Sequence, residues 1–89
     1  MIFIILSKWR KKPTKAGIAE TTKVMEQMVK EAGVKIIGFY WTLGRYDTVF
    51  IAEGKDEKTV MKSLARLGDI VSPDTLIAVP REEAIKLVE

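Results

Sequence analysis

Apolar positions along the chain change their spacing several times, and each change predicts a different element. Residues 2–7 are apolar at almost every position, which predicts a short buried strand. From Gly17 to Ala32 apolar residues recur every three or four positions, as on one face of a helix. Gly33 is the predicted C-terminal cap. The helix stripe consists of Ile18, Thr21, Val24, Met25, Met28, Val29 and Ala32.

The middle of the chain alternates with a period of two, which predicts two strands over residues 34–43 and 48–53. The loop from Gly44 to Asp47 joins them, and a short loop containing glycine between two such runs predicts a β-hairpin. Strict alternation divides the first strand into two faces. One face holds Val34, Ile36, Gly38, Tyr40 and Thr42, and the other holds Lys35, Ile37, Phe39, Trp41 and Leu43.

The last third of the chain repeats the order of helix and strand. Asp56 is the predicted N-cap of a second helix, which ends at Gly68. A last strand follows Pro73 and covers residues 75–79, and Pro80 then starts a short helix over residues 81–88. The apolar stripe of the second helix is Val60, Met61, Leu64, Ala65 and Leu67.

The order is therefore βαββαβ with a terminal helix, and residues 1–89 are expected to form a single α+β domain. This order predicts a ferredoxin-like antiparallel sheet with both main helices on one face. The strands are nevertheless apolar on both faces, so the uncovered face would expose a large apolar surface. A two-fold homodimer or a higher homo-oligomer, packed sheet on sheet, is the expected partner.

The composition excludes several kinds of functional site. The chain has no cysteine and no histidine, which excludes disulfides, thiolate or imidazole metal ligands, and triads built on these groups. We expect no metal site and no cofactor. Asparagine is absent while lysine and glutamate abound, a pattern typical of thermophile proteins. Without a signal peptide or a long apolar run, the sequence predicts a cytoplasmic protein outside the membrane.

Charge is uneven. Residues 1–35 contain eight basic and three acidic side chains, net +5, while residues 36–89 contain seven and nine, net −2. The excess lies in a basic run around Trp9, which has two interpretations: a solvated loop, or a contact for nucleic acid or an acidic ligand. Trp9 itself either packs over the end of the sheet or stacks on a base. The run consists of Lys8, Arg10, Lys11, Lys12 and Lys15.

The hairpin sequence FYWTLGRYD over residues 39–47 resembles the signature of the GYD domain family, small proteins of unassigned function. Glu53, Leu67-Gly68 and Thr75-Leu76 agree with this resemblance, which covers nearly the whole chain. It implies membership of the dimeric α/β barrel superfamily. Residues 10–17 align poorly with the family, so the resemblance implies no role for them.

The same hairpin is more loosely similar to that of the ligand-binding domain of leucine-responsive transcriptional regulators. Those domains bind amino acids between subunits. No helix-turn-helix precedes the first strand here, so the resemblance implies a stand-alone version.

The candidate ligand contacts gather at the mouth of the predicted barrel, and Trp9 could close over them. Their alternative role is structural, because Gly and Asp in hairpins mainly serve turn chemistry. The candidates are Trp9, Trp41, Thr42, Tyr46 and Asp47.

Three function hypotheses follow. The first is a homo-oligomeric module that binds a small organic ligand or acts as a regulator. The second is a cofactor-free oxygenase or isomerase of the dimeric α/β barrel type, and the third is a nucleic-acid binder through residues 8–15. An enzyme of this kind would have to use Asp47, Glu53, Tyr40, Tyr46, Trp41 or a lysine.

Overall fold

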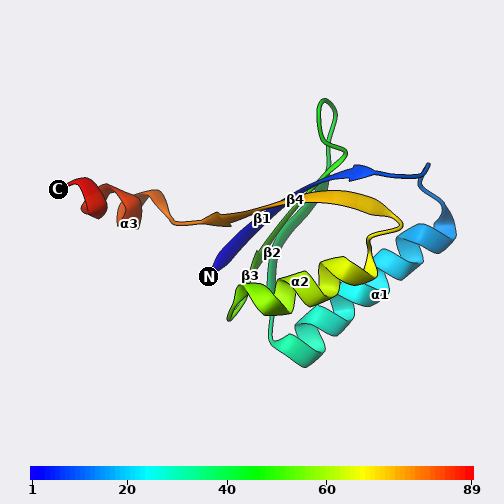
Figure 1. Ribbon diagram of the computed structural model, residues 1–89, viewed down its shortest axis with the longest axis horizontal. Coiled ribbons are helices and arrows are strands. Elements are labelled where there is room, and N and C mark those ends of the chain that lie inside the picture. Colours follow the sequence, from blue (N-terminus) through cyan, green and yellow to red (C-terminus); the bar gives the residue numbers. More distant parts are fainter.

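The computed structural model describes all 89 residues and shows a four-stranded antiparallel sheet with two long helices on one face (Figure 1). The strands lie in the order β2-β3-β1-β4, which is the ferredoxin-like arrangement. The predicted α+β fold is confirmed. The elements are β1 (Ile2–Trp9), α1 (Lys15–Ala32), β2 (Lys35–Trp41), β3 (Thr48–Glu53), α2 (Glu57–Arg66), β4 (Val71–Ala78), α3 (Arg81–Ile85) and a 3-10 turn (Lys86–Val88).

Side-chain caps explain where the long helices begin. The Thr14 hydroxyl accepts a hydrogen bond from the Gly17 N–H at 3.0 Å, so α1 begins two residues earlier than predicted. Gly33 ends α1 with a φ of 65°, as the sequence predicted. Asp56 caps α2 as predicted, but the C-cap of α2 is Leu67 rather than Gly68.

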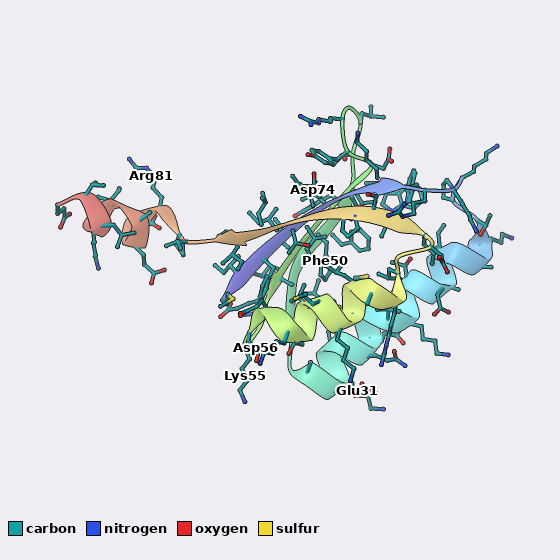
Figure 2. All side chains as sticks on the ribbon, in the orientation of Figure 1. Glu31, Phe50, Lys55, Asp56, Asp74 and Arg81 are labelled. Atoms are coloured by element: carbon teal, nitrogen blue, oxygen red, sulfur yellow. The ribbon has the colours of Figure 1, made fainter.

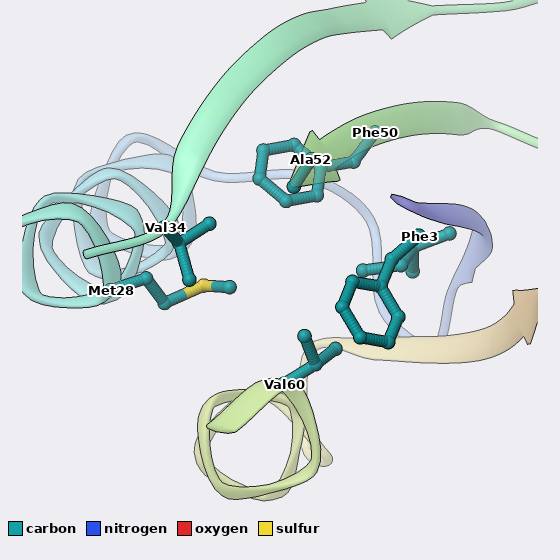
Figure 3. Close-up of a cluster of buried hydrophobic side chains, with 7 residues drawn as sticks. Phe3, Met28, Val34, Phe50, Ala52 and Val60 are labelled. Carbon is teal, nitrogen blue, oxygen red and sulfur yellow. The ribbon is translucent and has the colours of Figure 1, made fainter. Parts of the chain in front are cut away.

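The hydrophobic core lies between the sheet and the helices (Figure 3). Strand β1 sends every second side chain into it, and α1 and α2 send residues one or two turns apart. The main cluster consists of Phe3, Ile5, Met28, Val34, Phe50, Ala52 and Val60. A smaller cluster near the other end of the helices consists of Val24, Leu67 and Val71.

Strand β2 departs from strict alternation at Ile37. Ile36 lies opposite Ala52 on the helix-covered face, whereas Gly38 lies opposite Ile51 on the open face, so the register shifts between them. The extra residue is a β-bulge, which reverses the predicted facing of every position on one side of it. The helix-covered residues of β2 are therefore Ile36, Phe39 and Trp41, not the two sets predicted.

Strands β1 and β4 are both longer than predicted. They pair over eight positions, from Ile2 opposite Ala78 to Trp9 opposite Val71. Pro73 falls inside β4, where it is tolerated because β4 is an edge strand. The extension places Trp9 at the end of the sheet, directly before the basic loop.

The second face of the sheet carries no helix, and apolar side chains occupy its centre. Its apolar residues are Ile2, Ile4, Leu6, Tyr40, Val49, Ile51 and Leu76. Beyond β4 the chain runs into an arm, residues 79–89, that stands apart from the sheet and the long helices (Figure 1). None of the helices has the length and apolar character that crossing a membrane requires.

Candidate functional site

A cavity of about 230 Å³ lies between the sheet and the two long helices, toward the end of the sheet where β1 finishes. Residues 17–28 of α1 and the second half of α2 form its other walls. The sheet contributes Ile5, Ser7, Trp9, Phe39, Trp41, Thr48, Phe50 and Val71. The helices contribute Gly17, Ile18, Thr21, Thr22, Met25, Met28, Ser63 and Leu64.

Two aromatic pairs form much of the sheet side of this cavity. Trp9 and Trp41 meet edge to face, with ring centroids 4.8 Å apart and planes at 74°. Phe39 and Phe50 meet in the same way at 5.5 Å and 80°. Phe50 projects from the sheet toward the helices (Figure 2). Edge-to-face pairs stabilise one another, so these rings form a pre-organised apolar wall.

Two hydroxyl groups interrupt the apolar wall. Ser7 and Thr48 lie directly opposite each other on β1 and β3, and their exposed fractions are 6% and 5%. Neither hydroxyl makes a hydrogen bond within the protein. No fully enclosed polar side-chain atom lacks a partner, so both hydroxyl oxygens must reach open space. That space is the cavity that they line.

The mouth of the cavity is basic. Lys11 and Lys12 line it, followed by the N-cap Thr14, and α1 has no acidic residue in its first turn. The N-terminal end of a helix carries a partial positive charge, which adds to that of the lysines. Asp69, between α2 and β4, is the acidic residue of the lining. The potential at the mouth is therefore positive on the side of α1.

The structure divides the basic run among three places. Arg10 is tied to the start of β4, since its Nε donates to the Val71 carbonyl at 3.3 Å. Lys8 points to the open face, with its Nζ 6.0 Å from the centre of the Tyr46 ring. Only Lys11 and Lys12 reach the cavity lining, so the run does not form one stripe.

The five predicted site residues also lie in two different places. Trp9 and Trp41 line the cavity and touch each other, whereas Thr42, Tyr46 and Asp47 do not line it. The last three belong to the hairpin and its connection to β1. The structure thus brings together the two tryptophans and places the polar candidates outside the cavity.

Asp47 fastens the hairpin to the end of β1. Its carboxylate accepts a hydrogen bond from the Trp9 N–H at 2.9 Å, and its own N–H donates to the Ser7 carbonyl at 2.8 Å. Thr42 closes the base of the loop, because its hydroxyl donates to the Tyr46 carbonyl at 2.6 Å. Asp47 therefore ties the hairpin to the end of β1 without lining the cavity.

Tyr46 lies on the open-face side of the sheet. Its hydroxyl donates to the Asp74 carboxylate at 3.0 Å, and Asp74 lies opposite Leu6, on that face. In Figure 2 Asp74 is labelled on the hairpin side of the sheet. This hydrogen bond to a carboxylate, together with slight burial, raises the pKa of Tyr46 above its ordinary value. The neighbouring Arg45 acts in the opposite direction.

Sequence reasoning missed Ser7 and Thr48. The alternation of β1 runs Phe3, Ile5, Ser7, so a small polar residue takes the third core-facing position. A serine at the core-facing position of a strand is a usable signal, because buried hydroxyls require a partner. The register that sets Thr48 beside it could not be read from the sequence.

The chain matches the family described as the GYD domain over residues 3–88. No curated protein matches it significantly. Among solved structures it is similar to SCO4226 from Streptomyces coelicolor A3(2), with a TM-score of 0.57 at 13% identity, covering 88% of this chain and 95% of the other. It is also similar to a dimeric ferredoxin-like protein of unknown function from Thermobifida fusca, with a TM-score of 0.54 at 15% identity, covering 86% and 89%. At these identities the similarity shows the fold alone.

Proposed function

This chain belongs to the GYD domain family, and we propose that it works as a homodimer that binds a small organic molecule in the cavity under the helices. The observation that carries the ligand-binding proposal is the unpartnered pair Ser7 and Thr48, set in the otherwise apolar and aromatic sheet wall of the pocket. A hydroxyl that opens onto a cavity and has no protein partner is free to donate to and accept from a ligand. A pocket that keeps two of them is suited to a ligand that supplies the missing hydrogen bonds.

The size of the cavity limits the ligand. An apolar cavity of roughly 150 Å³ holds a benzene molecule, and pockets for drug-sized ligands start at roughly 300 Å³. At about 230 Å³ this cavity suits a molecule with one or two rings, or an aliphatic molecule of similar size. The edge-to-face tryptophans at its outer end favour a planar partner.

The open face of the sheet supports the proposal of a dimer. Its centre is the row formed by Ile51, Ile4 and Leu76 on three adjacent strands, and Leu76 has 49% of its surface exposed. Monomeric proteins rarely leave an apolar surface of this extent in water. A second copy packed sheet on sheet would cover it. The related structure from Thermobifida fusca is itself described as dimeric.

The C-terminal arm provides a second reason for self-association. Leu87 and Val88 have 81% and 87% of their surfaces exposed, and Val79 at the start of the arm has 56%. The arm projects away from its own sheet and helices (Figure 1), so its apolar side chains have no partner there. We propose that the arm packs against the second copy. The expected solution mass is that of a dimer, measured by analytical ultracentrifugation.

Ligand binding can be followed through the intrinsic fluorescence of the cavity, because both tryptophans of the chain line it. The probes are single-ring and short aliphatic acids, alcohols and amines, with thermal shift as the second readout. A ligand at 100 times its dissociation constant adds about 2.7 kcal/mol to the free energy of unfolding. Binding should change both signals together.

A pair of variants on α1 separates cavity binding from surface binding. Thr21→Phe fills the cavity from its lining, whereas Ala19→Phe adds the same ring at an exposed position of the same helix. We expect the first variant to abolish binding and the second to leave it intact. Equal binding by both variants would remove the cavity from the proposal, and no response to any probe would reject ligand binding.

A further inference from the structure

The geometry points to a ligand class for this cavity: a small ring-containing organic acid that also carries a hydroxyl or carbonyl oxygen. We propose that the ring packs against Trp41 and the phenylalanine pair, that the oxygen binds to the Ser7 and Thr48 hydroxyls, and that the carboxylate lies at the basic mouth beside Lys11 and Lys12. This inference rests on the proposed function, which it narrows from small organic molecules to one chemical class.

The hydroxyl pair determines what the inner end of the ligand must carry. Both groups can donate and accept hydrogen bonds, so together they suit a hydroxyl or a carbonyl oxygen. They sit between apolar side chains, with Phe50 and Ile5 forming the next row of the sheet. A charged group at this depth would lose its hydration without a counter-charge. The inner end should therefore be polar and neutral.

The mouth determines the charge of the outer end. Lys11 and Lys12 follow the end of β1, and α1 points its N-terminal end at the same place. Both the lysines and the helix end attract an anion, and both repel a cation. The unpartnered hydroxyls are an independent sign that the same cavity takes a ligand, so the helix end does not stand alone.

The spacing along β1 suits one ring between the two polar ends. Ser7 and Trp9 are two positions apart on the same face, which is roughly 7 Å. The lysines begin two residues after Trp9. A molecule whose oxygen lies at Ser7 and whose ring passes the indoles would thus present its far substituent to the lysines. A benzene ring with substituents at opposite ends has about this reach.

The experiment compares 4-hydroxybenzoate, benzoate, phenol and toluene by calorimetry and tryptophan fluorescence. We expect 4-hydroxybenzoate to bind more tightly than benzoate or phenol, each by about fivefold or more, since each lacks one of the two polar contacts. Thr48→Val should lower the affinity for 4-hydroxybenzoate about fivefold and leave the affinity for benzoate unchanged, while Thr48→Ser should retain the wild-type affinities. Thr75→Val is the matched control, because Thr75 is exposed on the same sheet outside the cavity lining.

The charged end is tested by Lys11→Gln combined with Lys12→Gln. This variant should bind both acids about fivefold more weakly and bind phenol with unchanged affinity. Added salt should weaken binding of the acids to the wild type but not to the variant. Equal affinity for acids and neutral compounds, or no effect of Thr48→Val on 4-hydroxybenzoate, would overturn the inference. If toluene and phenol bind while the acids do not, this inference fails and the proposed function stands. If none of the four compounds binds, the inference is rejected, and the wider probe panel decides the proposed function.

Discussion

The two faces of the sheet are built from the same strands and differ in what covers them. On β1, Phe3 has 1% of its surface exposed and Ile5 has 3%, while the alternate residues Ile4 and Leu6 are only half-buried. Both sets are fully apolar. The helices cover the first set, whereas no helix of the chain covers the second. The packing within one chain therefore explains only one of the two apolar faces, and the proposed dimer would explain the other.

The faces also differ in how polar groups enter them. On the helix side, Ser7 and Thr48 are buried and have no protein partner. On the open side, Tyr46 is half-buried and Asp74 is exposed, and the Tyr46 hydroxyl donates to the Asp74 carboxylate at 3.0 Å. A polar group that is paired within the protein is less available to a ligand than an unpaired hydroxyl that opens onto a pocket. This contrast favours the helix side for ligand binding and the open side for association.

The largest expected effect is on the free energy of unfolding, and it distinguishes the two faces of the sheet. Phe3→Ala removes a ring from the core cluster and should cost about 3–5 kcal/mol of unfolding free energy. The cost should not depend on protein concentration, because the ring packs within one chain. Ile4→Ala should cost less, and its cost should fall as the protein is diluted and the dimer dissociates.

Chemical denaturation at two protein concentrations measures both effects. If the cost of Ile4→Ala were the same at every concentration, the open face would not be an interface.

The second prediction places a charge at the centre of the open face. Ile51→Lys should convert the dimer to a monomer, since a lysine there would be buried against the second copy without a counter-charge. Val29→Lys is the control, because Val29 is 45% exposed on α1, away from this face. Analytical ultracentrifugation should show half the mass for the first variant and an unchanged mass for the second. A dimeric Ile51→Lys protein would place the interface elsewhere.

These contrasts also show how far the sequence leads. Element order and type followed from periodicity alone, because apolar spacing is set by burial against a helix or sheet layer. The bounds of β3 were predicted correctly as residues 48–53. The bulge at Ile37 was not predictable, since an extra residue leaves no mark in a strand that is apolar at most positions.

The site was predictable only in part, and for the same physical reason. Large aromatic side chains near strand ends pointed to Trp9 and Trp41, which do meet in the cavity lining. The pair of Ser7 and Thr48 depends on the register between two strands 41 positions apart in sequence, which no local pattern encodes. Asp47 was proposed either as a ligand contact or as a turn residue, and its hydrogen bonds to β1 belong to the second role.

The third prediction tests the connection between hairpin and cavity. Asp47→Ala removes the acceptor for the Trp9 N–H, a partly buried group, and should lower the free energy of unfolding by about 1–3 kcal/mol. Ligand affinity should change little at temperatures where the variant is folded, because Asp47 does not line the cavity. Thermal melting and calorimetry measure the two quantities. Weaker ligand binding with an unchanged melting temperature would instead show that Asp47 contacts the ligand.

The smallest expected effect concerns Tyr46 on the open side and depends on pH. Its pKa is raised by the hydrogen bond to Asp74, so this bond contributes stability that is fully present below the ordinary tyrosine pKa of about 10. The contribution is lost as the pH rises through the higher pKa of the folded state. Tyr46→Phe should therefore lower the melting temperature slightly at neutral pH, and the difference from wild type should shrink in strong alkali.

Tyr40→Phe is the matched control, since Tyr40 lies on the same face without this hydrogen bond. Melting curves of the three proteins between neutral and alkaline pH give the comparison, because a change common to all three is unrelated to the Tyr46 hydroxyl. A Tyr46→Phe protein that melts at the wild-type temperature at every pH would mean that the ring, which lies near Lys8 and Arg45, stabilises the hairpin and the hydroxyl does not. The open face would then contribute to the hairpin by packing alone, while Asp47 fixes it through hydrogen bonds to the backbone of β1.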